Sequence, residues 1–550
     1  MEAFTSKRIA SLIRAKLGAA AYVLSSRLGP SLFTTIIIGL FVLLVFRKIF
    51  QRRWKLPPGP RNLPIIGAIL SLDKEMHQSL AKHAEKYGPV IYFRLGSHSM
   101  LAVQSAEVGE ELFKKRDTEF ASRAHSTILY SVAKYFGFEA SNMGFSSYTP
   151  ALKQTRKICT TELLSSARLS KTEQIRWEEE GEMIKEVESL NGEEFELREL
   201  LHAMAMNVTC RMILGKQYYG KNVVLTKDLR EFQELMVEMV VAAGKPNIGD
   251  LVPWLRWLDP QGLTKQFKAL HEKQERVLKA ILDDHKKARE RAPYRLTTPS
   301  TASMDFVDIL LSLQGKYQLS DLNIMATVSD LLLGATDSTL MVVQWAIIEL
   351  VRHPETMAIL QTQLDHVVGK DRALLESDLP NIPFLGVVVK ETLRLHPPIP
   401  LLLPRMNEKQ TALHGYDIPA NTTVFVNVWA ISRDERNWEK ADQFIPERFM
   451  DSPVSVVGNH FKYTPFGAGR RQCVGVTMGM LMVERTLGSL VHAFDWLPAK
   501  GKTCADISVE ERYGLVLEPK QPLVCRAVPR LPKVDVYYNR QHSPRPHDQL

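Results

Sequence analysis

Apolar residues recur along most of this chain at the three- and four-residue spacing of helices. The spacing is clearest over residues 227–241, 263–291 and 324–352, and the last segment is apolar nearly all round, as in a helix buried at the centre of a domain. Strand signals are few and short: residues 90–95 and 100–103 flank a polar turn and predict a hairpin. The pattern therefore predicts a mainly α fold with small β-sheets.

The N-terminal end has a different pattern, because the uncharged stretch 28–46 separates two clusters of basic side chains. At 1.5 Å per residue this stretch just reaches across a hydrocarbon core of about 30 Å. We expect a single transmembrane helix here, with the basic residues of 47–55 favouring a cytosolic body. A cleaved signal peptide fits poorly because no small-residue cleavage site follows. A plastid transit peptide over residues 1–27 is an alternative.

Charge and cysteine content narrow the class of protein. The 550 residues have a formal net charge of +9, and residues 1–55 alone account for it, with ten basic side chains and one acid. The rest of the chain is formally neutral, so we expect no basic face for nucleic acid. The five cysteines are widely spread without a C-x-x-C pair, which excludes a disulfide scaffold and a zinc ribbon.

Three parts of the chain follow from these patterns. Residues 1–55 form the membrane anchor with its basic flanks, and residues 56–530 form one large body. The proline-rich stretch 56–67 is a stiff hinge between them, because proline fixes φ. Residues 531–550 contain proline and arginine and are expected to be a flexible tail.

The stretch from Phe466 to Gly475 has the sequence FGAGRRQCVG and is the most informative in the chain. Its glycines, such as Gly469, permit positive φ and the close approach of a flat ligand. Backbone donors and nearby arginines favour the thiolate of Cys473, which would then be a metal ligand. An isolated cysteine beside a glycine turn would more often be a buried structural residue. The full pattern resembles the haem-binding loop of the cytochrome P-450 family at every fixed position.

The resemblance implies the cytochrome P-450 fold and a haem b whose iron is ligated axially by the Cys473 thiolate. The family usually has tryptophan four residues before Arg156, where this chain has Leu152, so one haem propionate contact is in question and Lys153 is the candidate substitute. The residues that the resemblance assigns to haem binding are Cys473, Arg471, Arg156, Arg405, Phe466 and Gly469.

A charge network is the second point of resemblance. Glu391 and Arg394 lie three residues apart on a predicted helix, and a proline pair at 397–398 ends that helix. A lone Glu-x-x-Arg is weak evidence, because ordinary solvated helix pairs look the same. By resemblance, the two residues form a buried network with Arg448 that holds the cysteine loop in place. Their role would be structural.

The third point is the sequence GATDST at residues 334–339, which interrupts the central apolar helix. Serine and threonine can bond back to the preceding turn and open the helix, making room for dioxygen and water. The alternative is a structural kink with a satisfied aspartate. The family usually has glycine and threonine where this chain has Ala335 and Ser338. By resemblance, Asp337 and Ser338 deliver protons, and Thr339 is a substitute.

The resemblance, closest to the plant microsomal type, implies a monooxygenase in the endoplasmic reticulum membrane. No flavin-binding region is evident in the chain, so electrons from NADPH would come through a separate diflavin reductase, docking near Arg470 and Lys462. The expected substrate is a small apolar or aromatic metabolite, such as a phenylpropanoid or flavonoid. A terpenoid or fatty-acid hydroxylase, a haem-thiolate isomerase or dehydratase, and a non-catalytic haem protein are the alternatives.

Aromatic residues gather in the segment 124–145, which in the family covers the distal face of the haem. They would either stack on a flat substrate or pack the loop against the body, and Leu401–Leu403 would form an apolar wall opposite. The aromatic residues are Tyr130, Tyr135, Phe136, Phe138 and Phe145.

Overall fold

The computed structural model describes residues 35, 38–39, 54–219, 227–291 and 304–539. The chain forms two units, Met1–Leu56 and Pro57–Leu550. The membrane helix expected over residues 28–46 belongs to the first unit and lies almost wholly outside the described residues.

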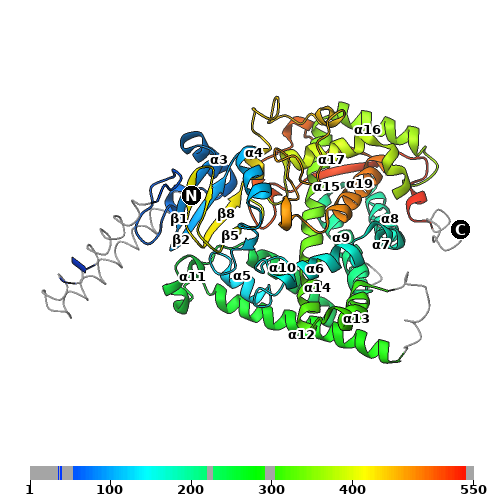
Figure 1. The fold of residues 1–550 in the computed structure, drawn as a ribbon. Coiled ribbons are helices and arrows are strands. Elements are labelled where there is room, and N and C mark those ends of the chain that lie inside the picture. The colour runs from blue at the N-terminus through cyan, green and yellow to red at the C-terminus, as the bar shows by residue number, and fades with distance from the viewer. Residues whose placement is uncertain (1–34, 36–37, 40–53, 220–226, 292–303, 540–550) are drawn as a thin grey trace. The chain divides into compact units, whose positions relative to one another are not determined.

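Helices make up most of the second unit, and the long predicted helices are confirmed (Figure 1). The α-helices are α3 (Met76–Tyr87), α4 (Ala106–Glu110), α5 (Tyr130–Tyr135), α6 (Pro150–Ile158), α7 (Ser166–Lys171), α8 (Glu173–Ser189), α9 (Leu197–Leu214), α10 (Lys227–Ala243), α11 (Ile248–Leu251), α12 (Leu263–Arg291), α13 (Phe306–Tyr317), α14 (Asp321–Ala335), α15 (Asp337–Arg352), α16 (Pro354–Val367), α17 (Pro383–Leu395), α18 (Val428–Ile431) and α19 (Val476–Ala493). Shorter helical turns are η1 (Ile69–Ser71), η2 (Glu111–Lys115), η3 (Cys159–Leu163), η4 (Pro253–Leu258), η7 (Glu376–Asn381), η8 (Pro446–Phe449), η9 (Gly469–Arg471), η10 (Cys504–Asp506) and η11 (Val534–Tyr537).

Helices α14 and α15 cross the centre of the helical part (Figure 1). A capping box between Ser320 and Asn323 begins α14, and nearly every residue of α15 from Leu340 onward is buried. In the part of the chain that the structure describes, Asp321–Arg352 is the one helical stretch long and apolar enough to cross a membrane, but it is mostly buried inside the body. It is therefore the core helix that the sequence predicts.

The sheets are small and lie mainly beside the helical part. The strands are β1 (Val90–Leu95), β2 (His98–Val103), β3 (Ser122–Arg123), β4 (Glu194–Glu196), β5 (Arg405–Asn407), β6 (Thr411–Leu413), β7 (Tyr416–Ile418), β8 (Thr422–Val426), β9 (Phe494–Pro498), β10 (Glu511–Arg512), β11 (Glu518–Pro519) and β12 (Val524–Pro529). The largest sheet has the order β1-β2-β8-β5-β3. Strands β1 and β2 pair antiparallel, which confirms the predicted hairpin, and β2 pairs parallel with β8.

The packed body continues past residue 530, contrary to the expectation of a flexible tail over 531–550. Val534, Val536 and Tyr537 of η11 are buried. The Tyr537 hydroxyl lies 2.7 Å from Nδ1 of the buried His492. These apolar side chains have a place in the core, so only residues 540–550 of the expected tail lie outside the described part.

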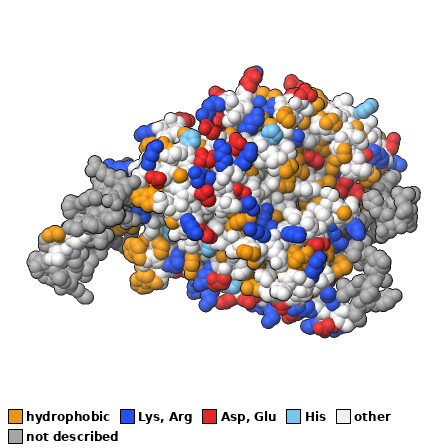
Figure 2. Space-filling model, viewed as in Figure 1, with side chains coloured by type: hydrophobic (Ala, Val, Ile, Leu, Met, Phe, Trp, Pro, Cys, Tyr) orange, Lys and Arg blue, Asp and Glu red, His pale blue; other side chains and the backbone are white. Residues whose placement is uncertain are grey.

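Charged side chains of both signs are interspersed over the face in Figure 2, and apolar side chains gather at the corner where α11 lies. Two segments, residues 63–70 and 248–258, carry exposed apolar residues, and both contact the β1–β2 turn. In the first segment Gly67 pairs with Leu95, and in the second Leu251 O accepts a hydrogen bond from the Ser97 amide at 2.9 Å. Large exposed apolar residues in these two segments are Ile65, Leu70, Trp254, Trp257 and Leu258.

Candidate active site

The cysteine loop is shaped by its own backbone. Gly467 and Gly469 have φ of +68° and +66°, values that side-chain-bearing residues rarely adopt. The Cys473 amide donates to Phe466 O at 3.0 Å, which closes the loop. The Gly475 amide, at the start of α19, donates to Cys473 Sγ at 3.3 Å. The loop therefore holds the sulfur at a helix N-terminus, as the sequence predicts.

Cys473 faces an internal space. Burial raises the pKa of its thiol, whereas the Gly475 amide and Arg156 lower it. The side chain nevertheless has exposed surface, unlike the buried Cys159, Cys210 and Cys525. A group that is surrounded by protein and still accessible borders a cavity, so the sulfur is available to a ligand within the body.

Four arginines gather beside the cysteine loop. Burial and the guanidinium groups of Arg471, Arg405 and Arg156 hold the pKa of Arg123 well below its usual value. Burial and the neighbouring Arg156 and Arg405 lower the pKa of Arg471 to about 9. Among the described residues, Asp117 is the carboxylate paired with this group, 3.1 Å from Arg405 Nη1. With four guanidinium groups and one paired carboxylate, the cluster has an excess of positive charge that an anionic ligand would offset.

Arg123 was missed by the sequence analysis, because a lone arginine in a two-residue strand carries no local signal. It lies in β3, which pairs with β5 so that Arg123 stands opposite Arg405. Its side chain is buried, and within the described ranges its Nε has no hydrogen-bond partner. An orphaned buried donor in this position points to an anionic ligand.

Leu152 is buried in the core and offers no polar atom to the cluster. Lys153, the expected substitute, lies with its Nζ 4.8 Å from the centre of the Tyr148 ring. The Tyr148 hydroxyl accepts a hydrogen bond from Arg470 Nη1 at 2.7 Å. Arg156 Nη2 donates to Gln472 O in the cysteine loop.

Glu391, Arg394 and Arg448 lie in contact with one another. Arg394 binds both oxygens of Glu391, at 2.7 and 2.8 Å, and Arg448 Nε donates to Glu391 Oε1 at 3.0 Å. The side chains of Glu391 and Arg394 are fully buried. Arg394 also donates to the carbonyls of Ser432, Ala441 and Gln443, in the segment that leads to the cysteine loop.

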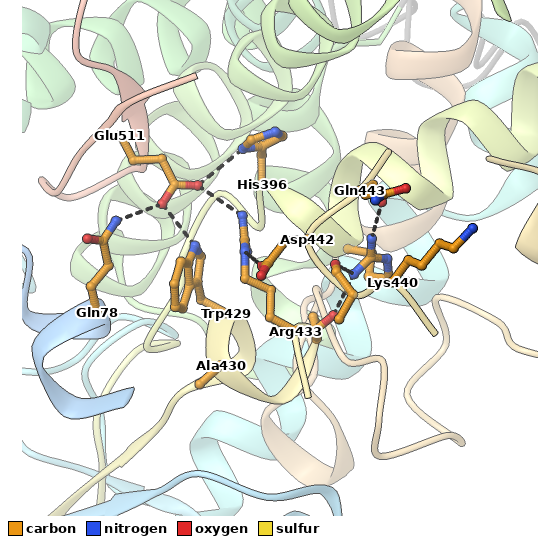
Figure 3. A network of polar contacts seen from close by, with 12 residues as sticks. Gln78, His396, Trp429, Ala430, Arg433, Lys440, Asp442, Gln443 and Glu511 are labelled. Atoms are coloured by element: carbon orange, nitrogen blue, oxygen red, sulfur yellow. Dashed lines mark hydrogen bonds and ion pairs between the residues drawn. The ribbon is translucent and has the colours of Figure 1, made fainter. Parts of the chain in front are cut away.

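A second buried charge network, missed by the sequence analysis, begins where the same helix ends (Figure 3). His396 has Glu349 2.8 Å from its Nε2 and Glu511 3.2 Å from its Nδ1. Although burial lowers it, the two carboxylates raise the pKa of His396 above its usual value. The network borders a cavity of about 730 Å³ to which the cysteine loop contributes no residue. The groups around Glu511 are His77, Gln78, His396, Trp429 and Arg433.

The central helix is interrupted at Thr336, between α14 and α15. Ser338 Oγ donates to Gly334 O at 2.8 Å, and Thr336 Oγ1 donates to Leu332 O at 3.2 Å. These bonds are the bonds back to the preceding turn that the sequence predicts. Gly334 is exposed although its helix is a core helix, so this side of the break borders an internal space.

Asp337 lies beside α9. Burial raises the pKa of its carboxyl, and His202 and Arg198 on α9 oppose the shift. Arg198 Nη2 donates to Glu518 Oε1 at 2.8 Å. Ser338 and Thr339 are partly exposed next to it. The acid and the hydroxyls therefore lie at the break, with a chain of polar groups behind them.

Most of the aromatic residues of the 124–145 segment pack against the body. Phe136 makes an edge-to-face contact with Phe267 of α12, with ring centres 5.2 Å apart, and Phe138 contacts His271 in the same way at 5.4 Å. Both phenylalanines are buried, so the structure favours packing over stacking on a substrate. Phe145 remains partly exposed.

The family model of cytochrome P-450 matches residues 57–526. The chain belongs to the cytochrome P-450 family. A flavonoid 3'-monooxygenase of Petunia hybrida is 36% identical over 90% of this chain and 97% of its own length. A flavonoid 3'-monooxygenase of Arabidopsis thaliana is 35% identical over 91% and 98%, respectively. The chain is thus a cytochrome P-450 monooxygenase.

Solved structures show the same fold. A zebrafish cytochrome P-450 with progesterone has a TM-score of 0.71 at 24% identity, over 82% of this chain and 99% of that chain. Family membership implies a haem bound through a cysteine thiolate. The accessible Cys473 thiol, the backbone of the glycine loop and the four-arginine cluster fit such a group, whose two propionates would bring negative charge to the arginines.

Proposed function

We propose that this chain is a membrane-anchored monooxygenase that hydroxylates a flavonoid or related phenylpropanoid at a ring carbon. Two features together carry the chemistry: the Cys473 thiol is accessible, and the central helix is interrupted at Thr336. The substrate class is supported by the relatives, which include a flavonoid 3',5'-hydroxylase of Solanum melongena at 34% identity over 92% of this chain.

In this proposal the Cys473 thiolate would bind the haem iron, and the haem, when bound, would supply the oxygen-activating chemistry. Arg123, Arg156, Arg405 and Arg471 hold its propionates. Phe466 and Gly469 shape the loop, and the ring of Phe466 lies against Gly479 of α19.

The residues at the helix break move protons. We assign this role to the Asp337 carboxyl and the Ser338 hydroxyl, which are both partly exposed at the break, and Thr339 stands next in the chain. Arg198 and His202 act on Asp337 electrostatically, and Arg198 also donates a hydrogen bond to Glu518, a partly exposed residue of β11.

Two electrons come from NADPH through a separate diflavin reductase. The proposed docking face is the cysteine side of the body, where Arg470 is exposed and Lys462 is partly exposed. A cationic face attracts an acidic partner and fixes its orientation.

We propose the endoplasmic reticulum membrane as the location, with residues 1–55 as a single-pass anchor and the body in the cytosol. Trp254, Trp257, Leu258, Ile65 and Leu70 support a second contact with the same membrane, since Trp257 is 80% and Leu70 76% exposed. Exposed aromatic and aliphatic groups of this size are suited to the membrane interface.

The test is a product screen. Microsomes containing the full chain and a diflavin reductase are supplied with NADPH and a panel of flavanones, flavonols, terpenoids and fatty acids, and products are identified by mass spectrometry. We expect one added oxygen on a flavonoid ring, only with NADPH. Oxidation of terpenoids or fatty acids alone would overturn the substrate class. The Cys473→Ser variant is the matched inactive control.

A further inference from the structure

Asp330 is a partly buried carboxylate of α14 that takes no part in the proposed function. Its Oδ1 accepts a hydrogen bond from Asn142 Nδ2 at 2.5 Å. Its Oδ2 accepts from the amides of Met143 and Gly144, at 2.5 and 3.1 Å. The side chain therefore ties the central helix to the loop of residues 142–146.

The cysteine loop holds the same segment from the other side. Arg471 Nη1 donates to Met143 O at 3.1 Å, and Nη2 donates to Ser146 O. Just before this segment, Phe138, Glu139 and Ala140 have φ of 50°, 54° and 57°. Three consecutive left-handed residues persist only where the surroundings hold them. The loop thus has a fixed position between Asp330 and the cysteine loop.

Asp330 lies on the side of the helix that borders the internal space. It stands four residues before the exposed Gly334, a spacing that places both on one face of α14. Burial raises the pKa of its carboxyl to about 6, against the effect of its three hydrogen bonds, and yet the side chain keeps some accessible surface. Cys473 likewise has a pKa raised by burial and a side chain with accessible surface.

The charge of Asp330 is not cancelled by a direct partner. Within the described ranges no cation forms an ion pair with it. Arg471 acts on Asp330 only through space. The hydrogen bonds of the Arg471 side chain go instead to Ala121 O, Met143 O and Ser146 O. Burial and Asp330 raise the pKa of Cys159, the other titratable neighbour, to about 12. Residues 142–146 contain no titratable side chain.

We propose that Asp330 is a specificity-determining residue that admits uncharged phenolic substrates to the site and excludes molecules that carry a carboxylate. Its Oδ1 accepts one hydrogen bond from the protein and has capacity for another. A phenolic hydroxyl would donate to it in a charge-assisted hydrogen bond. A substrate carboxylate would meet a like charge in a poorly solvated space. This proposal rests on the proposed function, because it narrows the substrate class of the same site.

The test compares two ligands that differ in charge. 4-Hydroxycinnamic acid and its methyl ester are titrated into the haem-loaded full chain, and binding is followed by the change in the haem spectrum. At about pH 7.5 we expect the ester to bind at least about tenfold more tightly than the acid. In Asp330→Asn the ratio should fall to within about threefold. Asp321→Asn, an exposed position at the start of the same helix, is the control and should keep the wild-type ratio.

A wild-type ratio near one, or an unchanged ratio in Asp330→Asn, would overturn the proposal. If Asp330→Asn does not fold, the pH dependence of the binding ratio in the wild type still tests the proposal. Its ratio should fall between about pH 7.5 and 5.5, where Asp330 takes up a proton while Arg471 and Cys159 do not titrate. A ratio that is constant over this range also overturns the proposal.

Turnover of flavonoids in the same preparations separates the two proposals. If flavonoids are hydroxylated but the ratio of ester to acid binding does not depend on Asp330, the specificity role is wrong and the proposed function stands. An Asp330-dependent ratio without flavonoid turnover means that the substrate assignment is wrong and the charge selection stands.

Discussion

Replacing Arg394 with alanine tests what holds the cysteine loop in place. The side chain is fully buried and makes five hydrogen bonds, two to Glu391 and three to backbone carbonyls. The carbonyls belong to Ser432, Ala441 and Gln443, so one side chain joins helix α17 to the segment before η8. The change removes all of these bonds and leaves Glu391 with Arg448 as its one ion-pair partner among the described residues.

The expected cost is large for a single substitution. Removing one partner of a buried ion pair costs about 3 to 5 kcal/mol. Each carbonyl that loses its donor adds about 1 kcal/mol. For a body of roughly 480 residues the entropy of unfolding is about 1 kcal/mol per kelvin. The melting temperature should therefore fall by about 6 to 8 °C.

The assay is thermal unfolding of the haem-loaded protein, together with its haem-to-protein ratio. Arg394→Lys keeps the charge but cannot reproduce the five-donor geometry, so it should lie between the wild type and Arg394→Ala. Arg436→Ala is the matched surface control. It removes a 2.6 Å ion pair with Asp434, but the Arg436 side chain is 75% exposed, and the melting temperature should change by about 1 °C or less.

We also expect Arg394→Ala to lose haem, because the segment that it anchors continues into the cysteine loop. The Trp438 indole, beneath Arg394, donates to Lys462 O at 3.3 Å, close to the start of that loop. A variant with normal haem content and a melting temperature within about 1 °C of the wild type would show that Arg394 does not hold the cysteine loop in place.

Three further predictions follow from the site. Asp337→Asn and Ser338→Ala should keep haem and substrate binding but lower the product formed per NADPH about tenfold; unchanged coupling would show that other groups move the protons. Arg123→Gln should speed haem loss to apomyoglobin about tenfold, because it removes a buried cation from the propionate cluster; an unchanged rate would contradict that role. The carboxylates around His396 raise its pKa above the usual 6.5, so its charged form stabilises the fold below that value and the effect is lost as pH rises through the folded pKa. Glu511 has a lowered pKa, so its contribution is present above 4.5 and is lost as pH falls. The gap in melting temperature between wild type and His396→Gln should therefore be larger near about pH 6 than near pH 9, and a constant gap would contradict the network.

The parts of the site that could be predicted from the sequence depend on local geometry. Gly467, Gly469 and Gly475 form a turn and a helix start within ten residues of Cys473, so turn chemistry alone places the sulfur. The break at Thr336 is equally local, because Ser338 bonds back over one turn. The helix predicted over 263–291 has those bounds in the structure, since its apolar spacing continues throughout.

The remaining parts depend on contacts between distant segments. Arg123 joins the arginine cluster through the pairing of β3 with β5, more than 280 residues apart. Asp330 binds residues 142–144, and no spacing in the sequence connects them. Whether Phe136 packs against the body or stacks on a substrate could not be predicted for the same reason, because its partner Phe267 lies on another helix. The packing of η11 was missed because proline and arginine near the C-terminus hid three buried apolar residues.

The central claim is that Cys473 holds the haem through its thiolate. The most direct test is the absorption spectrum of the reduced, carbon monoxide-treated protein, measured for the wild type and for Cys473→Ser after reconstitution with haem. We expect the red-shifted band of thiolate ligation in the wild type and its loss in Cys473→Ser. A variant that retains this band, or a wild type that lacks it while binding haem fully, would contradict the assignment.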